Sequence, residues 1–407
     1  MNNASSLSIR LHGMVVGVLQ KDARTSFSFS RTYLDVPRRP VLGQAYEDDL
    51  RRRRLGGGGR LPAFFSNMLP EGTLRERLAS ALRLTTKDEF ELLAALGADL
   101  PGAVTATPFD EIVAGYEAAG GEEEESPTLP PREDDVLRFS LAGVQFKLSM
   151  VREGERLTLP ASGRGGNWIV KLPSPGYPSL PENEHVTMTW AGRAGINVAE
   201  HELMPLGKLI GVPQQLLEGL SGKAFITRRY DRMPEGQCIH QEDFAQVFDV
   251  YPERKYDATN HETIANVILR LTGQEGFKEF LQRLIFVVLS GNGDAHLKNW
   301  SLYYPDKIHA RLSPAYDLVA TIQYLPKQRL ALNFAKSKSF DDVSLAGFQR
   351  LARKLDVDEA EVTETVRSGV AAVLAAWRDL RGDMIVSKVY SSRVEEHLRK
   401  LPLAKAG

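Results

Sequence analysis

The chain of 407 residues contains very little cysteine and no long apolar run. Cys238 is its only cysteine, so no disulfide can form within the chain, which is typical of proteins in a reducing cytoplasm. No apolar run approaches the ~18 residues that a membrane helix needs, and the N-terminus lacks the pattern of a secretory signal peptide. The sequence therefore favours a cytoplasmic protein that does not act on a membrane.

An excess of charge of either sign is also missing. Lysine and arginine number 51, aspartate and glutamate number 52, and the formal net charge is −1. Without a global basic field, direct binding of nucleic acid is not the expected activity. Hydrophobic residues make up 43% of the chain, which is typical of a globular protein, and the length predicts two or three domains.

One stretch has the composition of a linker. Residues 116–135 combine two adjacent glycines, a run of four glutamates and three prolines. Such a segment is solvated and commonly separates domains. We expect it to follow a small α+β domain at 1–115. After it, residues 136–232 are rich in predicted strands and residues 233–407 in predicted helices.

The first domain shows three local patterns. Short alternating runs between residues 7 and 35 predict antiparallel strands with tight turns. Four arginines at 51–54, followed by four glycines at 56–59, predict an exposed and flexible loop. Thr86 and Glu89 form a capping-box pattern ahead of an apolar helix.

Helical periodicity dominates the last part of the chain. Apolar residues recur at steps of three and four from Phe277 to Leu289 and from Val362 to Trp377, which predicts two long helices with buried faces. A strand-rich lobe followed by a helical lobe is the order found in protein kinases, in which ATP lies between the lobes. The sequence therefore predicts an α+β chain with a two-lobe, protein-kinase-like fold, a small α+β N-terminal subdomain and an all-helical C-terminal lobe.

The strongest chemical signal is the segment Gly-Asn-Gly-Asp-Ala-His-Leu-Lys-Asn-Trp at 291–300. Asp294 and Asn299 stand five apart, and a loop with this spacing can hold a carboxylate at an incoming hydroxyl and an amide oxygen on a metal ion. Asp317, in Pro-Ala-Tyr-Asp-Leu, would supply a second Mg²⁺ ligand, because magnesium prefers hard oxygen donors. Each of the three also has a structural alternative as a turn or capping residue.

Lys171 ends the apolar run Trp-Ile-Val-Lys at 168–171. A buried lysine is unfavourable unless it is paired, and both ATP phosphates and Glu184 of the following helix could pair with it. A solvent-exposed lysine at the strand end is the alternative. His296 could donate to a phosphate oxygen or be structural, and Lys298 is expected to lie exposed on the loop.

Two further segments could contact a nucleotide. Residues 139–147 contain small residues that let backbone N–H groups approach an anion, although both G-x-G-x-x-G and G-x-x-x-x-G-K-[ST] are missing. A bulged strand turn is the alternative there. Residues 227–232 end a strand between the two lobes, where backbone groups could pair with adenine and Tyr230 could stack on it. An ordinary connection with an ion pair between Asp231 and Arg232 is the alternative.

Seven ordered motifs make almost the whole chain similar to the HipA family, the serine/threonine-kinase toxins of bacterial toxin–antitoxin pairs. The motifs are Leu-Pro-Ala-Phe-Phe-Ser-Asn-Met-Leu-Pro-Glu-Gly at 61–72, Gly-Ala-Asp-Leu-Pro-Gly-Ala at 97–103, S-x-A-G-x-Q-x-K at 140–147, Lys-Leu-Pro at 171–173, Gln-Glu-Asp at 241–243, Gly-Asp-Ala-His-Leu-Lys-Asn at 293–299 and Tyr-Asp at 316–317. Their number and order make the resemblance specific.

The resemblance implies a role for each matching residue. Asp294 would be the catalytic base, Lys171 would bind the ATP phosphates, and Asn299 and Asp317 would hold Mg²⁺. Ser140 would be a self-phosphorylation site that ejects the nucleotide loop and switches the enzyme off. Further ATP contacts would come from Ala142, Gly143, Val144, Gln145, Phe146, Lys147, Arg228, Arg229, Tyr230, His296 and Tyr316.

The chain departs from the family pattern at two of these positions. Arg228 and Phe146 stand where relatives carry an acidic residue. The hinge can still pair with adenine through its backbone, so the first change is compatible with the implied role. The second change leaves the role of the Phe146 side chain open.

The resemblance also implies partners. A HipA-type kinase would phosphorylate a protein of translation such as an aminoacyl-tRNA synthetase, in the best-known case the one for glutamate. It would bind a small, HipB-like helix-turn-helix antitoxin, so contact with DNA would come only through that partner. Two alternatives stay open. One is a kinase of a small molecule or lipid headgroup, since lipid kinases also use D-x-H-x-x-N. The other is a catalytically silent corepressor, which the intact set of site residues disfavours.

Overall fold

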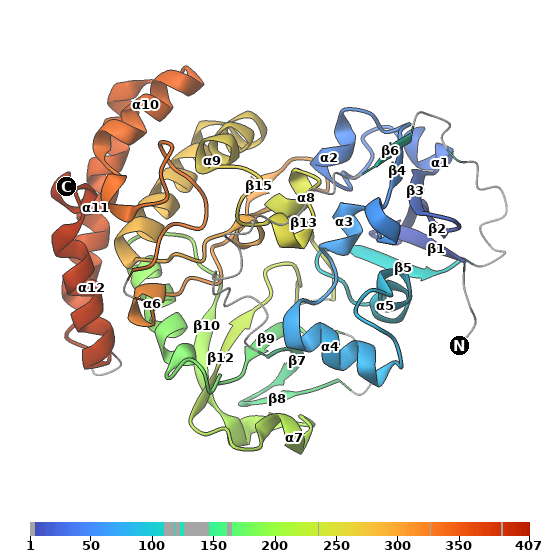
Figure 1. Cartoon of the computed structure of the whole chain (residues 1–407), viewed down its shortest axis with the longest axis horizontal. Helices are drawn as coiled ribbons and strands as arrows, with labels where there is room; N and C mark the ends of the chain where they lie inside the picture. Colours follow the sequence, from blue (N-terminus) through green and yellow to red (C-terminus); the bar gives the residue numbers. More distant parts are fainter. Residues whose placement is uncertain are drawn as a thin grey trace.

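Three β-sheets, each from a consecutive part of the chain, organise the molecule. The computed structural model describes residues 5–109, 118, 123–125, 146–160, 165–234, 236–325, 327–383 and 386–407. Within these residues the first two sheets have six strands each and the third has three. Figure 1 shows the first sheet at one end of the molecule, the last three long helices at the other end, and the second and third sheets between them.

The first sheet has the strand order β5-β1-β2-β3-β4-β6. Its strands are β1 (Ser6–Leu11), β2 (Met14–Lys21), β3 (Thr25–Phe29), β4 (Arg53–Leu55), β5 (Val104–Pro108) and β6 (Glu123–Glu125). Leu7, Ile9 and Leu11 alternate along β1 and are fully buried, because a strand directs every second side chain to one face. The antiparallel strands predicted between residues 7 and 35 are therefore confirmed.

Short helices add their apolar side chains to the core of this sheet. They are α1 (Arg31–Leu34), α2 (Gln44–Glu47), α3 (Ala63–Ser66), α4 (Gly72–Ala81) and α5 (Glu89–Leu96). The capping box predicted from Thr86 and Glu89 is wrong, since α5 begins at Glu89 after Asp88. The Glu89 side chain is buried and forms ion pairs with Arg60 and Arg75 instead.

The arginine run at 51–54 is not the flexible loop that its composition predicted. Arg53–Leu55 forms β4, which pairs with β3 and, in parallel, with β6. Arg53 contacts Glu123 at 2.9 Å and Arg52 contacts Glu124 at 2.9 Å. Opposite charges on neighbouring strands stabilise their pairing, so acidic residues assigned to a solvated linker form a strand here.

The second sheet has the order β10-β12-β9-β7-β8-β11. Its strands are β7 (Lys147–Glu153), β8 (Arg156–Thr158), β9 (Trp168–Lys171), β10 (His201–Pro205), β11 (Leu209–Ile210) and β12 (Lys223–Arg228). The predicted helix near residue 182 is α6 (Leu180–Arg193), which packs against β10 and β12, and a short α7 (Gln214–Leu217) follows. This sheet and α6 form the strand-rich lobe.

The helical lobe is built around α9 (His261–Ser290) and α11 (Glu359–Leu380), with α8 (Phe244–Val247), α10 (Leu345–Leu355) and α12 (Lys388–Lys400). The face predicted from Phe277 to Leu289 is buried, as expected. Trp190 of α6 joins the lobes, because its ring lies 5.1 Å from that of Phe286 in α9 and 4.9 Å from that of Trp377 in α11. These contacts hold the two lobes on one continuous core.

One part of the fold prediction needs correction. The helical lobe also contains a small sheet of β13 (His240–Asp243), β14 (Ser301–Tyr304) and β15 (Arg311–Leu312), so it is not all-helical. These strands have only two to four residues, so a period of two does not stand out in the sequence. Across the described part of the chain, no helix combines the length and apolar character that crossing a bilayer requires.

Truncation of the buried face of α9 should weaken the fold. Leu284 is fully buried, and Leu284→Ala should lower the free energy of unfolding by about 2–5 kcal/mol because it leaves a cavity in the main core. Lys278→Ala, on the exposed face of the same helix, should change it by less than about 0.5 kcal/mol. Calorimetric melting of both variants measures the difference, and equal melting temperatures would contradict this account of the core.

Candidate active site

The predicted catalytic loop begins where α9 ends. Gly291 terminates the helix with a φ of 66°, a left-handed conformation that favours glycine. The Asn292 side chain then accepts a hydrogen bond from the Asp294 amide at 3.0 Å, and the Asn299 side chain donates to the Asp294 carbonyl at 2.8 Å. The two amide side chains thus hold the backbone of Asp294 and bring Asp294 and Asn299 together.

Lys171 is buried at the end of β9, with 3% of its surface exposed. Its Nζ forms ion pairs with Glu184 of α6 and with Asp317. Lys147, which lies opposite Lys171 in the register of β7 and β9, contacts the second oxygen of Asp317 at 2.8 Å. These four residues form what we call the lysine–carboxylate cluster. A solvent-exposed Lys171 is therefore excluded.

Asp317 is held in this cluster by its charge, through its contacts with Lys147 and Lys171. Its φ of 54° lies in the left-handed region, which is uncommon for residues other than glycine. Burial alone would raise the pKa of Asp317, but the Lys147 and Lys171 ammonium groups hold that pKa well below its usual range. Asp317 is therefore ionised at neutral pH.

Asp294 has the opposite electrostatic character. Burial raises the pKa of Asp294 to about 6, and the negative charge of Asp317 adds to this rise. A hydrogen bond of 2.5 Å from the Tyr256 hydroxyl to Oδ1 and the charge of Lys255 oppose it. A carboxylate with a pKa near the working pH suits a general base.

His296, which stands between Asp294 and Asn299 in the sequence of the loop, is buried. Its ring meets the Tyr256 ring edge-on at 5.0 Å, and neither ring nitrogen has a hydrogen-bond partner among the described residues. Burial holds the pKa of His296 well below its usual range, so the ring is neutral. Two unmet polar atoms inside a site are compatible with contact to a ligand.

Lys298 is not the exposed loop lysine that the sequence predicted. Its Nζ donates to the Asn67 carbonyl at 2.7 Å and lies 3.2 Å from Asp243 and 3.4 Å from Glu71. Glu71 also forms an ion pair with Lys255, and these two lysines overcome the effect of burial and lower the pKa of Glu71 to about 2. Residues of the N-terminal domain therefore hold the catalytic loop from the side.

The predicted adenine hinge makes its contacts within the protein, through both its backbone and its side chains. The amides of Arg228 and Arg229 donate to the carbonyls of Glu200 and Asn167 at 2.8 and 2.9 Å. The Arg229 guanidinium pairs with Asp231 at 2.9 Å. Any contact of Arg228 and Arg229 with a base would thus use backbone atoms other than these two N–H groups.

The aromatic residues of the site stack on each other. The Tyr230 and Tyr316 rings lie nearly parallel with centroids 5.9 Å apart, and the Tyr316 hydroxyl donates to the Lys298 carbonyl at 2.9 Å. Phe146 lies under the guanidinium of Arg77 of α4, 5.0 Å from its ring centroid, which gives this departure from the family pattern a structural contact. Ser140, Ala142, Gly143, Val144 and Gln145 lie outside the described residues.

Two family models match the chain. The HipA-like C-terminal domain matches residues 139–377, and the HipA N-terminal domain matches residues 7–107.

The chain belongs to the HipA family.

Relatives at the level of sequence and structure agree with this assignment. The chain is 41% identical over 406 residues to Y4dM of Sinorhizobium fredii, a protein named as a kinase. The match covers 98% of this chain and 97% of that protein. It is 26% identical to the serine/threonine-protein kinase toxin HipA of Shewanella oneidensis, over 86% of this chain and 84% of the toxin. The named relatives are kinases, which confirms the prediction of a phosphotransferase at the level of the family.

A solved structure shows the same fold. The Shewanella oneidensis HipA in complex with HipB and operator DNA matches with a TM-score of 0.73 at 21% identity, covering 98% of this chain and 96% of that one. The predicted two-lobe, kinase-like architecture is thereby confirmed.

The HipA-family site has few donors for a metal ion. The described residues contain no group of three or more His, Cys, Asp or Glu side chains that could hold one. Asn299 and Asp317 offer oxygen atoms, and the Asn299 oxygen is available because the amide nitrogen already bonds the Asp294 carbonyl. Mg²⁺ commonly takes one or two protein oxygens and completes its shell with phosphate and water, so this pair fits magnesium.

Sequence reasoning missed the residues around Asp294 that do not belong to the lysine–carboxylate cluster. Tyr256, Lys255 and Glu71 contact Asp294 or its loop, yet only Glu71 lies in a recognised motif, at 61–72. No spacing rule links a tyrosine 38 positions upstream to a catalytic carboxylate. The pairing of Glu71 with two lysines could have been suspected only from that motif.

Loss of the Tyr256 hydroxyl should raise the pKa of Asp294. A hydrogen bond to a charged group contributes about 1.5–3 kcal/mol, so Tyr256→Phe should raise this pKa by about one unit or more. Titration of ¹³C-labelled aspartate by NMR measures it, since a carboxyl with a pKa of about 6 stands apart from exposed aspartates. Tyr390→Phe, which removes a hydroxyl bonded to Thr187, is the control, and an equal response of both variants would contradict the assignment.

Proposed function

We propose that this chain is a cytoplasmic, ATP- and Mg²⁺-dependent serine/threonine-protein kinase that acts as the toxin of a toxin–antitoxin pair. The observation that carries this proposal is the contact between the buried Lys171 and Asp317, close enough to the Asp294 carboxyl for Asp317 to raise its pKa. A protein that only binds a partner has no need to bring together a buried ammonium group, a carboxyl group with a low pKa and a carboxyl group with a pKa near neutrality.

Each group has a chemical task in the proposed reaction. Asp294 accepts the proton of a serine or threonine hydroxyl while the hydroxyl oxygen forms a bond to the γ-phosphorus of ATP and ADP departs. Lys171, held by Glu184, neutralises charge on the phosphates. Asn299 and Asp317 would hold Mg²⁺, which supplies further neutralisation of the phosphate charge.

The remaining nucleotide contacts follow from the family resemblance. The backbone of 228–230 would meet adenine, with Tyr230 and Tyr316 at its side, and His296 would donate to a phosphate oxygen. Residues 142–147 would cover the phosphates, and Ser140 would be a self-phosphorylation site. A phosphate on Ser140 would add a charge of about −1.5 to −2 beside the nucleotide and so oppose its binding.

The proposed partners rest on the relatives. The Shewanella oneidensis HipA is a serine/threonine-protein kinase toxin and is seen with HipB and operator DNA. We propose a HipB-like helix-turn-helix antitoxin for this chain, contact with DNA only through it, and a protein of translation such as an aminoacyl-tRNA synthetase as substrate. The balanced charge of the chain supports indirect rather than direct DNA contact.

Replacement of the base tests the proposal. Asp294→Asn should lower the rate of phosphate transfer from labelled ATP by about 10²–10⁴-fold, because the carboxamide cannot accept the hydroxyl proton. ATP affinity should stay unchanged, whereas Lys171→Met should weaken it. Labelled Ser140 in the unaltered protein, detected by mass spectrometry, is the expected product of self-phosphorylation.

Asp341→Asn is the matched control. It makes the same chemical change at an exposed position of the 3-10 helix Phe340–Asp342 and should leave the rate unchanged. Growth arrest on expression that Asp294→Asn relieves supports the toxin, and absence of ATP binding at millimolar concentration would instead favour a corepressor. Labelling of a metabolite or lipid with no labelled protein would replace the protein kinase by a small-molecule kinase.

A further inference from the structure

A cleft of about 880 Å³ lies between the N-terminal domain and the helical lobe. One wall comes from the glycine turn before Arg60, the start of α4 and residues 86–89. The other wall comes from residues 252–256 of the helical lobe. None of the residues assigned to ATP or Mg²⁺ lines this cleft, so it is a different space from the nucleotide site.

The inner end of the cleft lies next to the proposed catalytic base. Lys255 and Tyr256 line it, and the Tyr256 hydroxyl donates to Asp294 Oδ1 at 2.5 Å. The Lys255 charge acts on Asp294, and the Lys255 carbonyl accepts from the amide of Leu297 in the catalytic loop at 3.1 Å. A molecule that fills the cleft thus lies against Tyr256, which contacts Asp294 directly.

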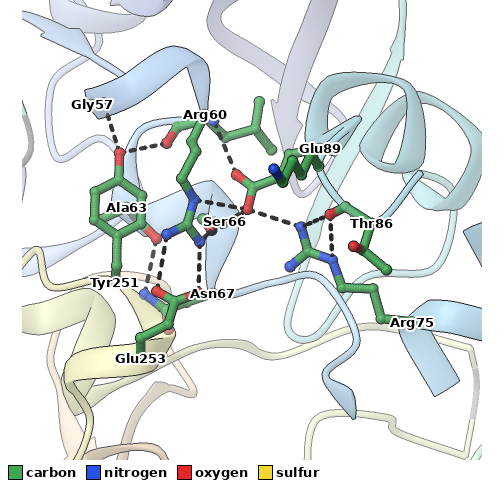
Figure 2. Close-up of polar contacts among 12 residues, drawn as sticks. Gly57, Arg60, Ala63, Ser66, Asn67, Arg75, Thr86, Glu89, Tyr251 and Glu253 are labelled. Carbon is green, nitrogen blue, oxygen red and sulfur yellow. Dashed lines mark hydrogen bonds and ion pairs between the residues drawn. The ribbon is translucent and has the colours of Figure 1, made fainter. Parts of the chain in front are cut away.

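A network of ion pairs joins the two walls and fixes their spacing (Figure 2). Arg60 bridges Glu89 of the N-terminal domain and Glu253 of the helical lobe, at 2.9 Å to each, and its guanidinium lies 4.2 Å from the centre of the Tyr251 ring. Arg75 of α4 contacts Glu89 from the other side at 2.9 Å. The cleft is therefore preformed, and little ordering is needed when a ligand enters.

The hydrogen bonds of Tyr251 fix the same junction. Its hydroxyl accepts from the amide of Gly57 at 2.8 Å and donates to the carbonyl of Leu61 at 2.9 Å. At the inner end, Glu71 pairs with both Lys255 and Lys298. Contacts between the N-terminal domain and the helical lobe thus fix the walls of the cleft relative to each other.

The charges of the cleft point to the class of its ligand. Four cationic side chains and four carboxylates line it: Arg60, Arg75, Lys87, Lys255, Glu71, Glu76, Glu89 and Glu253. These charges balance, so the cleft has no field that concentrates a polyanion such as RNA or a phosphorylated headgroup. Donors and acceptors in equal number, with exposed Glu76, Lys87 and Glu253 at the rim, suit an extended peptide with its own N–H and C=O groups.

We propose that this cleft binds the acceptor of the reaction, an extended segment of a substrate protein, and places its serine or threonine hydroxyl at Asp294. This inference rests on the proposed kinase function and adds the substrate site to it. The N-terminal domain then contributes directly to substrate binding, since α4 and Glu71 form one wall. The volume of the cleft falls within the range of about 300–1,000 Å³ that is typical of ligand pockets in proteins.

Bulky side chains at the rim test the proposal. Glu76 of α4 and Lys87 before α5 are exposed, so Glu76→Trp and Lys87→Trp should fold normally and fill the cleft from two positions. The probe is a degenerate peptide library with one central serine or threonine, incubated with labelled ATP and Mg²⁺. Each variant should lower kcat/KM for the peptides by about tenfold or more, through KM, with ATP affinity and melting temperature unchanged.

A matched variant and the contrary results separate this inference from the kinase proposal. Ser80→Trp adds the same side chain at an exposed position of α4 outside the cleft and should have no effect. Peptide phosphorylation at the unaltered rate in both rim variants would overturn the cleft and leave the kinase standing. Labelling of inositol or of phosphatidylinositol vesicles but of no peptide would overturn the peptide ligand. Failure of the unaltered protein to transfer phosphate to any acceptor would overturn the kinase itself.

Discussion

The burial of the Lys171 ammonium group with the carboxylates of Glu184 and Asp317 is the constraint on which the arrangement of the site depends. An ion without a partner in the interior costs several kcal/mol, so these groups have to stay in contact. They come from β9, from α6 and from the segment after β15, and their contact fixes the strand-rich lobe against the helical lobe. Lys147 supplies a second cation, which balances the two carboxylates.

The same contact explains why the site is ready for a nucleotide in the proposed function. Phosphate oxygens could replace Asp317 as the partners of Lys147 and Lys171, and a divalent cation could replace the lysines as the partner of Asp317. An exchange of partners would therefore leave every buried charge compensated. A cluster with a surplus of either sign would not allow this, because one charge would remain buried alone.

The sequence predicted the parts of the molecule that follow a strong period or a chemical spacing. Leu7, Ile9 and Leu11 alternate as a strand with one buried face does, and Phe277 to Leu289 recur as a buried helix face does. Asp294 and Asn299 were recognised because their spacing alone brings them onto one loop. Lys171 and Asp317 were each singled out by their local sequence, but no local pattern predicts that residues 146 positions apart form an ion pair.

The failures have a common physical cause. Arg53 and Arg54 were assigned to a loop because local composition cannot show that Glu123 and Glu124 lie opposite them. Lys298 was assigned to solvent because its partners Asn67 and Asp243 lie on separate elements. Glu89 was assigned to a cap because its arginine partners are remote in the sequence. In each of these cases an opposite charge that the local sequence does not reveal made burial or pairing favourable.

Those distant charges also show that the N-terminal domain is part of the catalytic unit. Glu71 reaches Lys255 and Lys298, and Asp99 contacts Arg232 beside the hinge at 2.7 Å. The domain therefore touches both the loop that carries Asp294 and the connection between the lobes. The two aspartates differ in what governs them: burial dominates at Asp294 and raises its pKa to about 6, whereas the two lysines that contact Asp317 keep it charged. Two like residues in one site can thus accept a proton and hold a cation, because burial governs one and charge the other.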